Sequence, residues 1–143
     1  MKVFLIFIGL LMIQVGFISY QGDLARYLKM SADIKALAEE CAVGAAQYYD
    51  EAAYGQGLMV INQTEATKLI AYLAGLAADR LGLQDPSALT WQLHVTDDQT
   101  AAASAGPPVV TVEMQLQTPD LFRLSLIEVR QIKRSARYEL AHF

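Results

Sequence analysis

An uninterrupted apolar run at the N-terminus constrains this chain more than any other feature. From Val3 to Tyr20 the sequence has 18 residues without a charge, preceded by Lys2 and followed by Asp23 and Arg26. As a helix this run would be about 27 Å long, roughly the hydrocarbon thickness of a bilayer. Within the run Gln14 is the one strongly polar side chain, and in lipid it would favour a partner on a neighbouring helix.

Three interpretations of this run compete. A cleaved secretory signal needs small residues at its cleavage site, and the exit through Ile18–Gly22 lacks that pattern. A helix buried in a globular core would be long for a chain of 143 residues. An uncleaved single-pass anchor, with Lys2 on the cytoplasmic side and the remaining chain outside, fits the pattern best. We therefore divide the chain into an apolar membrane or filament-core helix, 1–21, and an extracytoplasmic domain, 22–143.

The apolar run is expected to continue directly into an amphipathic helix over 22–54. This stretch lacks proline and is rich in helix-forming residues, and a narrow apolar stripe recurs at spacings of three and four. Gly55 and Gly57 provide the predicted stop. Tyr48, Tyr49 and Tyr54 lie at this end, and we expect them to pack on the sheet rather than to bind a ligand.

A second helix is predicted over 63–81. Asn62 and Glu65 have the spacing of a helix cap, and Gly82 follows the last apolar position. Asn62-Gln63-Thr64 also matches the acceptor triplet for N-glycosylation. The cap is the simpler explanation of these residues.

Three strands complete the predicted fold. Apolar and polar residues alternate over about 89–96, 109–117 and 129–140, the pattern of strands with one buried face. In the third strand we expect Ile132, Ala136, Tyr138 and Leu140 to point inward. Leu121 to Leu126 is expected to be a short helical or irregular segment. The fold class is α+β: a long N-terminal helix, a second helix and a small three-stranded antiparallel sheet.

Composition argues against several kinds of chemistry. Eleven basic and fifteen acidic residues give a net charge of −4, which disfavours a nucleic-acid partner. The single cysteine, Cys41, cannot close a disulfide within the chain and is expected to be a small buried residue. His94 and His142 have no ligands at metal spacing, and Asp97-Asp98 fits a solvated turn better than a calcium site. We predict no catalytic, cofactor-binding or metal-binding residues, and therefore no enzyme.

Basic residues are concentrated toward the C-terminus and acidic residues before it. Such asymmetry could guide one subunit toward another, although a solvated sheet face explains the same residues. The candidate subunit contacts are Gln14, Glu39, Glu40, Arg130, Lys133, Arg134 and Arg137. The residues expected to anchor the first helix, or to pack in a filament core, are Phe4, Ile6, Phe7, Leu10, Leu11, Ile13 and Phe17.

Taken together, this plan resembles a type IV pilin-like protein, and within that group a minor pilin of the Tad (TadE/TadG-like) type. The segments 31–42 and 132–139 carry the resemblance most closely. It implies a structural subunit of an extracellular filament, or of its assembly machinery, that polymerises by packing of the apolar N-terminal helices. Its partners would be copies of itself or other pilin-like subunits, with the membrane as host before assembly. The alternative is a single-pass membrane-anchored binding module that never polymerises.

Overall fold

The computed structural model describes residues 2–98, 107–118, 121–122 and 129–140. Three α-helices, α1 (Lys2–Ala46), α2 (Glu51–Tyr54) and α3 (Gln63–Arg80), are followed by a 3₁₀ turn, η1 (Pro86–Ala88). Three strands complete the order: β1 (Leu89–Thr96), β2 (Val109–Gln117) and β3 (Gln131–Glu139). The α+β class predicted from the sequence is confirmed, as are its long first helix and its three-stranded sheet.

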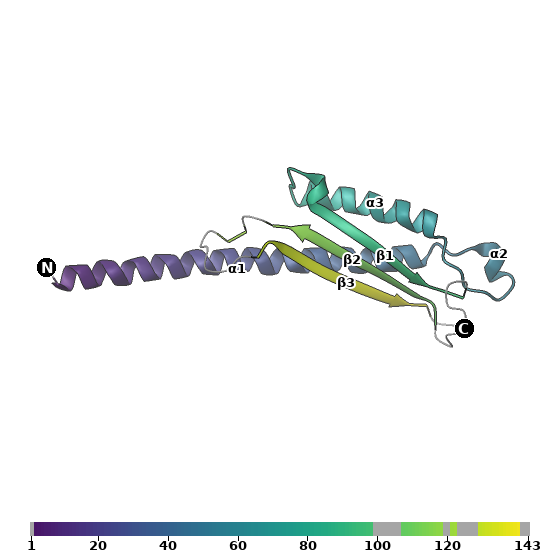
Figure 1. The fold of residues 1–143 in the computed structure, drawn as a ribbon, viewed down its shortest axis with the longest axis horizontal. Coiled ribbons are helices and arrows are strands. Elements are labelled where there is room, and N and C mark those ends of the chain that lie inside the picture. Colours follow the sequence, from purple (N-terminus) through teal and green to yellow (C-terminus); the bar gives the residue numbers. More distant parts are fainter. Residues whose placement is uncertain (1, 99–106, 119–120, 123–128, 141–143) are drawn as a thin grey trace.

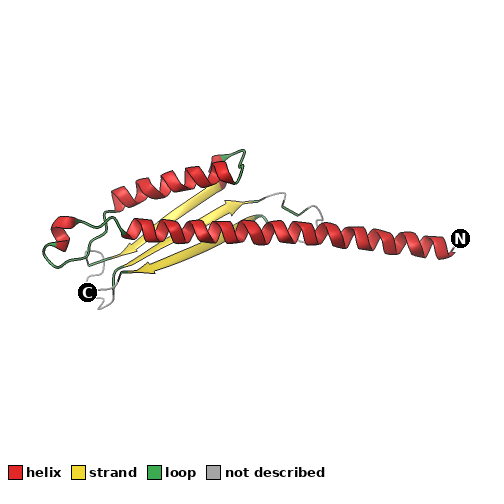
Figure 2. Ribbon diagram, turned by 180° about the vertical axis from the view of Figure 1, so that it is seen from behind, coloured by secondary structure: helices red, strands yellow, loops and turns green. Residues whose placement is uncertain are grey.

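The elements form two layers, with α1 as the common spine (Figure 1). The sheet is antiparallel in the order β1-β2-β3. The second half of α1 contacts β2 and β3, while α3 runs back beside α1 and contacts β1. Both helices therefore cover the same face of the sheet, as the view from behind shows (Figure 2). The first half of α1 projects beyond these layers, so the N-terminus and the described end of the chain lie at opposite ends of the molecule.

The core lies where α1, α3 and the inner face of the sheet meet. Ile34 and Cys41 of α1, Ile70 of α3 and Met114 of β2 are completely buried there. In β2 every second residue, from Val110 to Leu116, is buried, which is the alternation predicted from the sequence. Burial of each large aliphatic side chain contributes about 1.5–3 kcal/mol. The sheet's opposite face is polar.

The long helix ends earlier than the sequence predicts. Helix α1 stops at Ala46 rather than near 54, and a separate short helix covers Glu51–Tyr54. Two interactions explain the break. The Asp50 carboxylate accepts hydrogen bonds from the amides of Ala52 and Ala53, at 2.8 and 3.2 Å, and so begins a new helix. The backbone around Tyr49 instead pairs with Ile61 as an isolated bridge.

The predicted second helix and strands are found with small shifts. Helix α3 ends at Arg80, and the Asn62 side chain accepts a hydrogen bond from the Glu65 amide at 3.3 Å, so the capping role is confirmed. Strand β3 is shorter at both ends than the predicted 129–140. Tyr138 lies on the inner face as predicted, opposite the buried Val110, but its side chain is 41% exposed because it lines a groove beside the end of α1. Of the predicted segment 121–126, only Leu121 and Phe122 are among the described residues, and they are not helical.

Candidate functional site: the projecting half of α1

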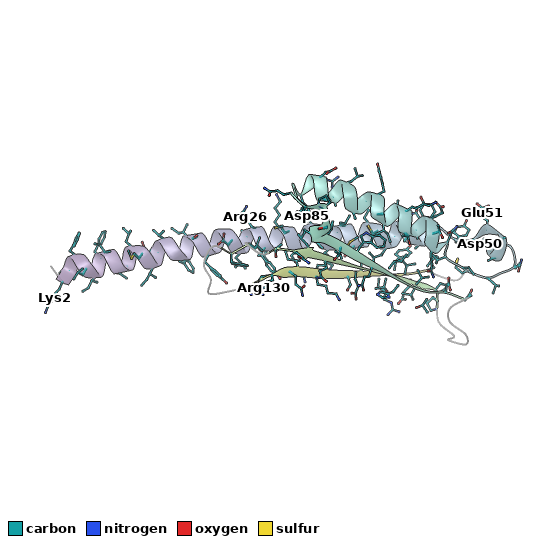
Figure 3. All side chains as sticks on the ribbon, turned by 45° about the horizontal axis from the view of Figure 1, so that its top comes forward. Lys2, Arg26, Asp50, Glu51, Asp85 and Arg130 are labelled. Atoms are coloured by element: carbon teal, nitrogen blue, oxygen red, sulfur yellow. The ribbon has the colours of Figure 1, made fainter. Side chains whose placement is uncertain are left out.

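The projecting half of α1, here called the stem (residues 2–20), is apolar on all sides, and no described helix or strand covers it. Val3 and Met12 are 80% and 70% exposed, although they lie on different sides of the helix. An amphipathic helix would present one apolar stripe to its own protein. The stem instead presents apolar side chains all round, which is the surface of a helix surrounded by other apolar material (Figure 3).

All seven predicted anchor residues lie on this uncovered half. Their exposed fractions run from 48% for Leu11 to 69% for Ile13. Helix α1 is long and apolar enough here to cross a membrane, and its most apolar window is entirely unburied. A signal sequence would satisfy the same length and composition. The exposure does argue against the interpretation of this run as the core helix of a globular protein.

An aromatic contact marks where the stem meets the rest of the molecule, here called the head (described residues from 21 onward). Phe122 lies beside two tyrosines of α1, with its ring centre 6.1 Å from that of Tyr20 and 6.3 Å from that of Tyr27. The two tyrosines are seven residues apart and so share one side of the helix. Close to this boundary Asp23 is buried. Sequence reasoning did not single out Phe122, because its contact depends on a loop that returns to α1.

The predicted subunit-contact residues do not form one cluster. Glu39 and Glu40 are exposed on α1, where Glu40 lines a groove beside α3, and Gln14 is exposed on the stem beside Ile13 and Phe17. Arg130 lies just before β3 and is exposed. Within the described residues, no ion pair joins Glu39 or Glu40 to any of the four basic positions.

The basic residues of β3 have partners of their own within the head. On the polar face Lys133 lies 2.7 Å from a Glu113 carboxylate oxygen, and this lysine lowers the pKa of Glu113 by hydrogen bonding. Arg137 pairs with Glu139 at 2.7 Å. Arg134 points the other way, and its Nε donates to the Ser31 hydroxyl of α1 at 2.9 Å. Arg134 thus joins the sheet to the helix.

The acidic pair at the end of β1 has a structural role, which corrects the predicted solvated turn. The Asp97 side chain is buried, and its carboxylate accepts a hydrogen bond from the Ile61 amide at 3.1 Å. Asp98 accepts one from the Met59 amide at 2.8 Å. The two carboxylates therefore hold the segment between α2 and α3 against the end of the sheet. Sequence reasoning missed this because the donors lie more than 30 residues away.

The tyrosines at the far end of α1 also differ from expectation. Tyr48, Tyr49 and Tyr54 are 40%, 42% and 55% exposed rather than packed on the sheet. The rings of Tyr49 and Tyr54 lie 5.2 Å apart, and with Tyr138 they line a groove of about 440 Å³. The early end of α1 explains this arrangement, because the chain turns away after Ala46 and leaves Tyr49 and Tyr54 in an open groove beside the end of β3.

Cys41 and His94 are the cysteine and histidine side chains that the described residues contain. Cys41 is completely buried, and this burial raises the pKa of its thiol to about 12. His94 is exposed on the polar face of the sheet, and His142 lies outside the described residues. Among the residues that the structure describes, no group of histidine, cysteine and carboxylate side chains could hold a metal ion.

Comparison with known proteins finds no relative: no family model, curated protein or solved structure matches this chain.

Proposed function

We propose that this chain is a pilin-like structural subunit of an extracellular, Tad-like filament or of its assembly machinery, with a structural and not a catalytic role. One observation supports this proposal above all others. A single unbroken helix of 45 residues is a bare apolar rod in its first half and the spine of a folded head in its second. A subunit that stores its stem in a membrane and later packs it in a filament core needs both halves in one rigid element.

The stem requires an apolar environment at each stage. An uncovered apolar surface of this extent is unstable in water, so lipid or other apolar helices must surround it. Inside lipid, helices associate through close packing and hydrogen bonds and not through the hydrophobic effect. Gly9 and Gly16 lie two turns apart with open space around each, so a neighbouring helix could approach closely there. Gln14 offers an amide to the same kind of neighbour.

Intact mass and N-terminal sequencing of the protein, from membranes and from sheared surface material, would test the proposal. Recovery as a main component of long surface fibres is the expected result for a filament subunit. Recovery from membranes alone, in fixed stoichiometry with other proteins, would contradict polymerisation. That second result would favour the anchored binding module.

A charge within the stem should abolish its anchoring. Ile13→Asp or Ile6→Lys would place a charge in the hydrocarbon region, at a cost of about 2.5–3.5 kcal/mol on insertion scales. We expect the variant to be lost from membrane and fibre fractions. Tyr72→Asp, at a head position that is 65% exposed, is the matched control and should fractionate like the wild type. An Ile13→Asp protein that still enters membranes and fibres would contradict the assigned role of the stem.

A further inference from the structure

The basic side chains of the described residues fall into two groups. Those on β3, Arg130 just before it, and those on the parts of α1 and α3 far from the stem are engaged within the chain. The ion pairs are Lys35–Glu39 at 3.8 Å, Lys68–Glu65, Lys133–Glu113 and Arg137–Glu139, each of these three at 2.7 Å. Within the described part of the chain, Lys2, Arg26, Lys29 and Arg80 make no such interaction. Lys2 lies at one end of the stem, and the other three lie beyond its opposite end.

The three cations near the head converge on one groove. This groove, of about 660 Å³, lies between α1 and the end of α3, and Arg26, Lys29 and Arg80 line it. Arg80 reaches it because α3 runs back toward the stem (Figure 1). Side chains such as Met30, Leu37 and Leu81 contribute its apolar part.

The groove is polarised along α1. Arg26 lies about 9 Å beyond Tyr20 along the helix axis, and Lys29 about 14 Å. The carboxylates that line the groove, Asp33 and Glu40, lie at about 20 and 30 Å. The cationic end therefore faces the stem, and the acidic end faces away from it. Asp85, labelled near Arg26 in Figure 3, directs its carboxylate to the Ser87 amide of its own turn at 2.8 Å.

This arrangement matches the chemistry of a bilayer surface. With Tyr20 at the edge of the hydrocarbon, Arg26 would lie close to the headgroup layer, which is about 5–8 Å deep. Lys29 would lie within about one Debye length, near 8 Å, of that layer. Arginine recognises phosphate through paired hydrogen bonds, and lysine acts as a point charge. Cations that make no ion pair or hydrogen bond among the described residues are available for these contacts.

We propose that Arg26, Lys29 and Arg80 bind the phosphate groups of anionic phospholipids at the membrane surface beneath the head. This inference rests on the membrane stage of the proposed function, and it adds a lipid class and the residues that select it. The contact would hold the head against the bilayer until the stem leaves the lipid.

The test uses the full chain in nanodiscs that contain equal amounts of phosphatidylcholine and phosphatidylglycerol. Native mass spectrometry of the released protein measures which lipid remains bound. We expect the wild type to retain phosphatidylglycerol preferentially. The triple variant Arg26→Gln, Lys29→Gln, Arg80→Gln should lose this preference by about tenfold or more. A control with Lys35→Gln, Lys68→Gln and Arg137→Gln removes the same charge from paired sites and should keep the preference.

Five results would overturn the inference. Unchanged phosphatidylglycerol retention in the triple variant would show that these cations do not select lipid. Displacement of the lipid by inorganic phosphate, but not by sodium chloride at equal ionic strength, would assign them to free phosphate. If the triple variant lost chemical cross-linking between copies of the chain but still retained lipid, the three cations would be assigned to contact with a second subunit. If the wild type failed to enter nanodiscs, both this inference and the membrane stage of the proposed function would be contradicted. If it entered normally but showed no preference for phosphatidylglycerol, only this inference would be contradicted.

Discussion

At the scale of single residues, two buried groups hold the head together in ways that composition does not reveal. Asp97 is a buried carboxylate whose hydrogen bond to the Ile61 amide fixes a distant loop. Cys41 is a buried thiol on the inner side of α1. The hydrogen bonding of Asp97 compensates the cost of burying its carboxylate, and the neutral thiol of Cys41 packs as a small apolar group, so each contributes measurably to stability.

Removal of the Asp97 carboxylate should destabilise the head. Asp97→Ala leaves the Ile61 amide without this acceptor, and an unsatisfied buried donor costs about 1–3 kcal/mol. We expect a lower unfolding free energy for the chain in detergent, measured by urea titration of its circular dichroism. Asp79→Ala removes an exposed carboxylate from α3 and should change stability by less than about 0.5 kcal/mol. Equal effects for the two variants would contradict the role given to Asp97.

Cys41 should make stability fall at alkaline pH. The pKa of the folded thiol is about 12, whereas the ordinary value is 9.0. The unfolded chain therefore loses this proton first as the pH rises, and each proton lost favours unfolding. The contribution of the neutral thiol is complete below pH 9.0 and disappears toward about 12. The difference in unfolding free energy between the wild type and Cys41→Ala should shrink over that interval, and a constant difference would contradict this.

At the scale of elements, Gly44 is the small residue of α1 against which Leu69 of α3 packs. A Cβ added to Gly44 would lie 2.7 Å from Cδ2 of Leu69, whereas one added to Gly75 meets nothing within 4 Å. Gly44 thus lets the two helices approach, while Gly75 serves no such purpose on the exposed side of α3.

Matched substitutions of these two glycines should have opposite signs. Gly44→Val would force the Leu69 side chain to shift and is expected to destabilise by about 1–3 kcal/mol. Gly75→Ala replaces a glycine in an exposed helix interior and should stabilise by about 1 kcal/mol. Thermal unfolding of both variants beside the wild type would measure the two shifts. Stabilisation by Gly44→Val would show that the helices are not in close contact there.

The elements were more predictable than their ends and contacts. Local periodicity was enough to predict α3 and the strands, because each of these elements buries the apolar face of its own repeating pattern. The end of α1 was missed because the Asp50 cap and the bridge from Tyr49 to Ile61 compete with helix propagation. The burial of Asp97 and the meeting of Arg26 with Arg80 in one groove could not be predicted, since both require knowledge of which segments return to α1.

At the scale of the whole molecule, the stem should span the membrane and the head should lie on its extracytoplasmic side. Lys2 flanks the stem on its N-terminal side, and more than 100 residues follow Tyr20. Domains of that length are translocated largely regardless of their charge. We therefore expect trypsin added to spheroplasts to digest the head. Protection of the head in intact spheroplasts, with digestion only after lysis, would contradict this topology.

The continuity of α1 from stem to core also has a mechanical consequence. A pull along the stem reaches the head through the middle of its core, since the same helix lies under β2 and β3 and beside α3. Such a load acts on those contacts in shear and all together, and does not open them one after another from an edge. The head would then yield only when its whole core gives way, so a fibre under tension should slip between neighbouring stems before any single subunit unravels.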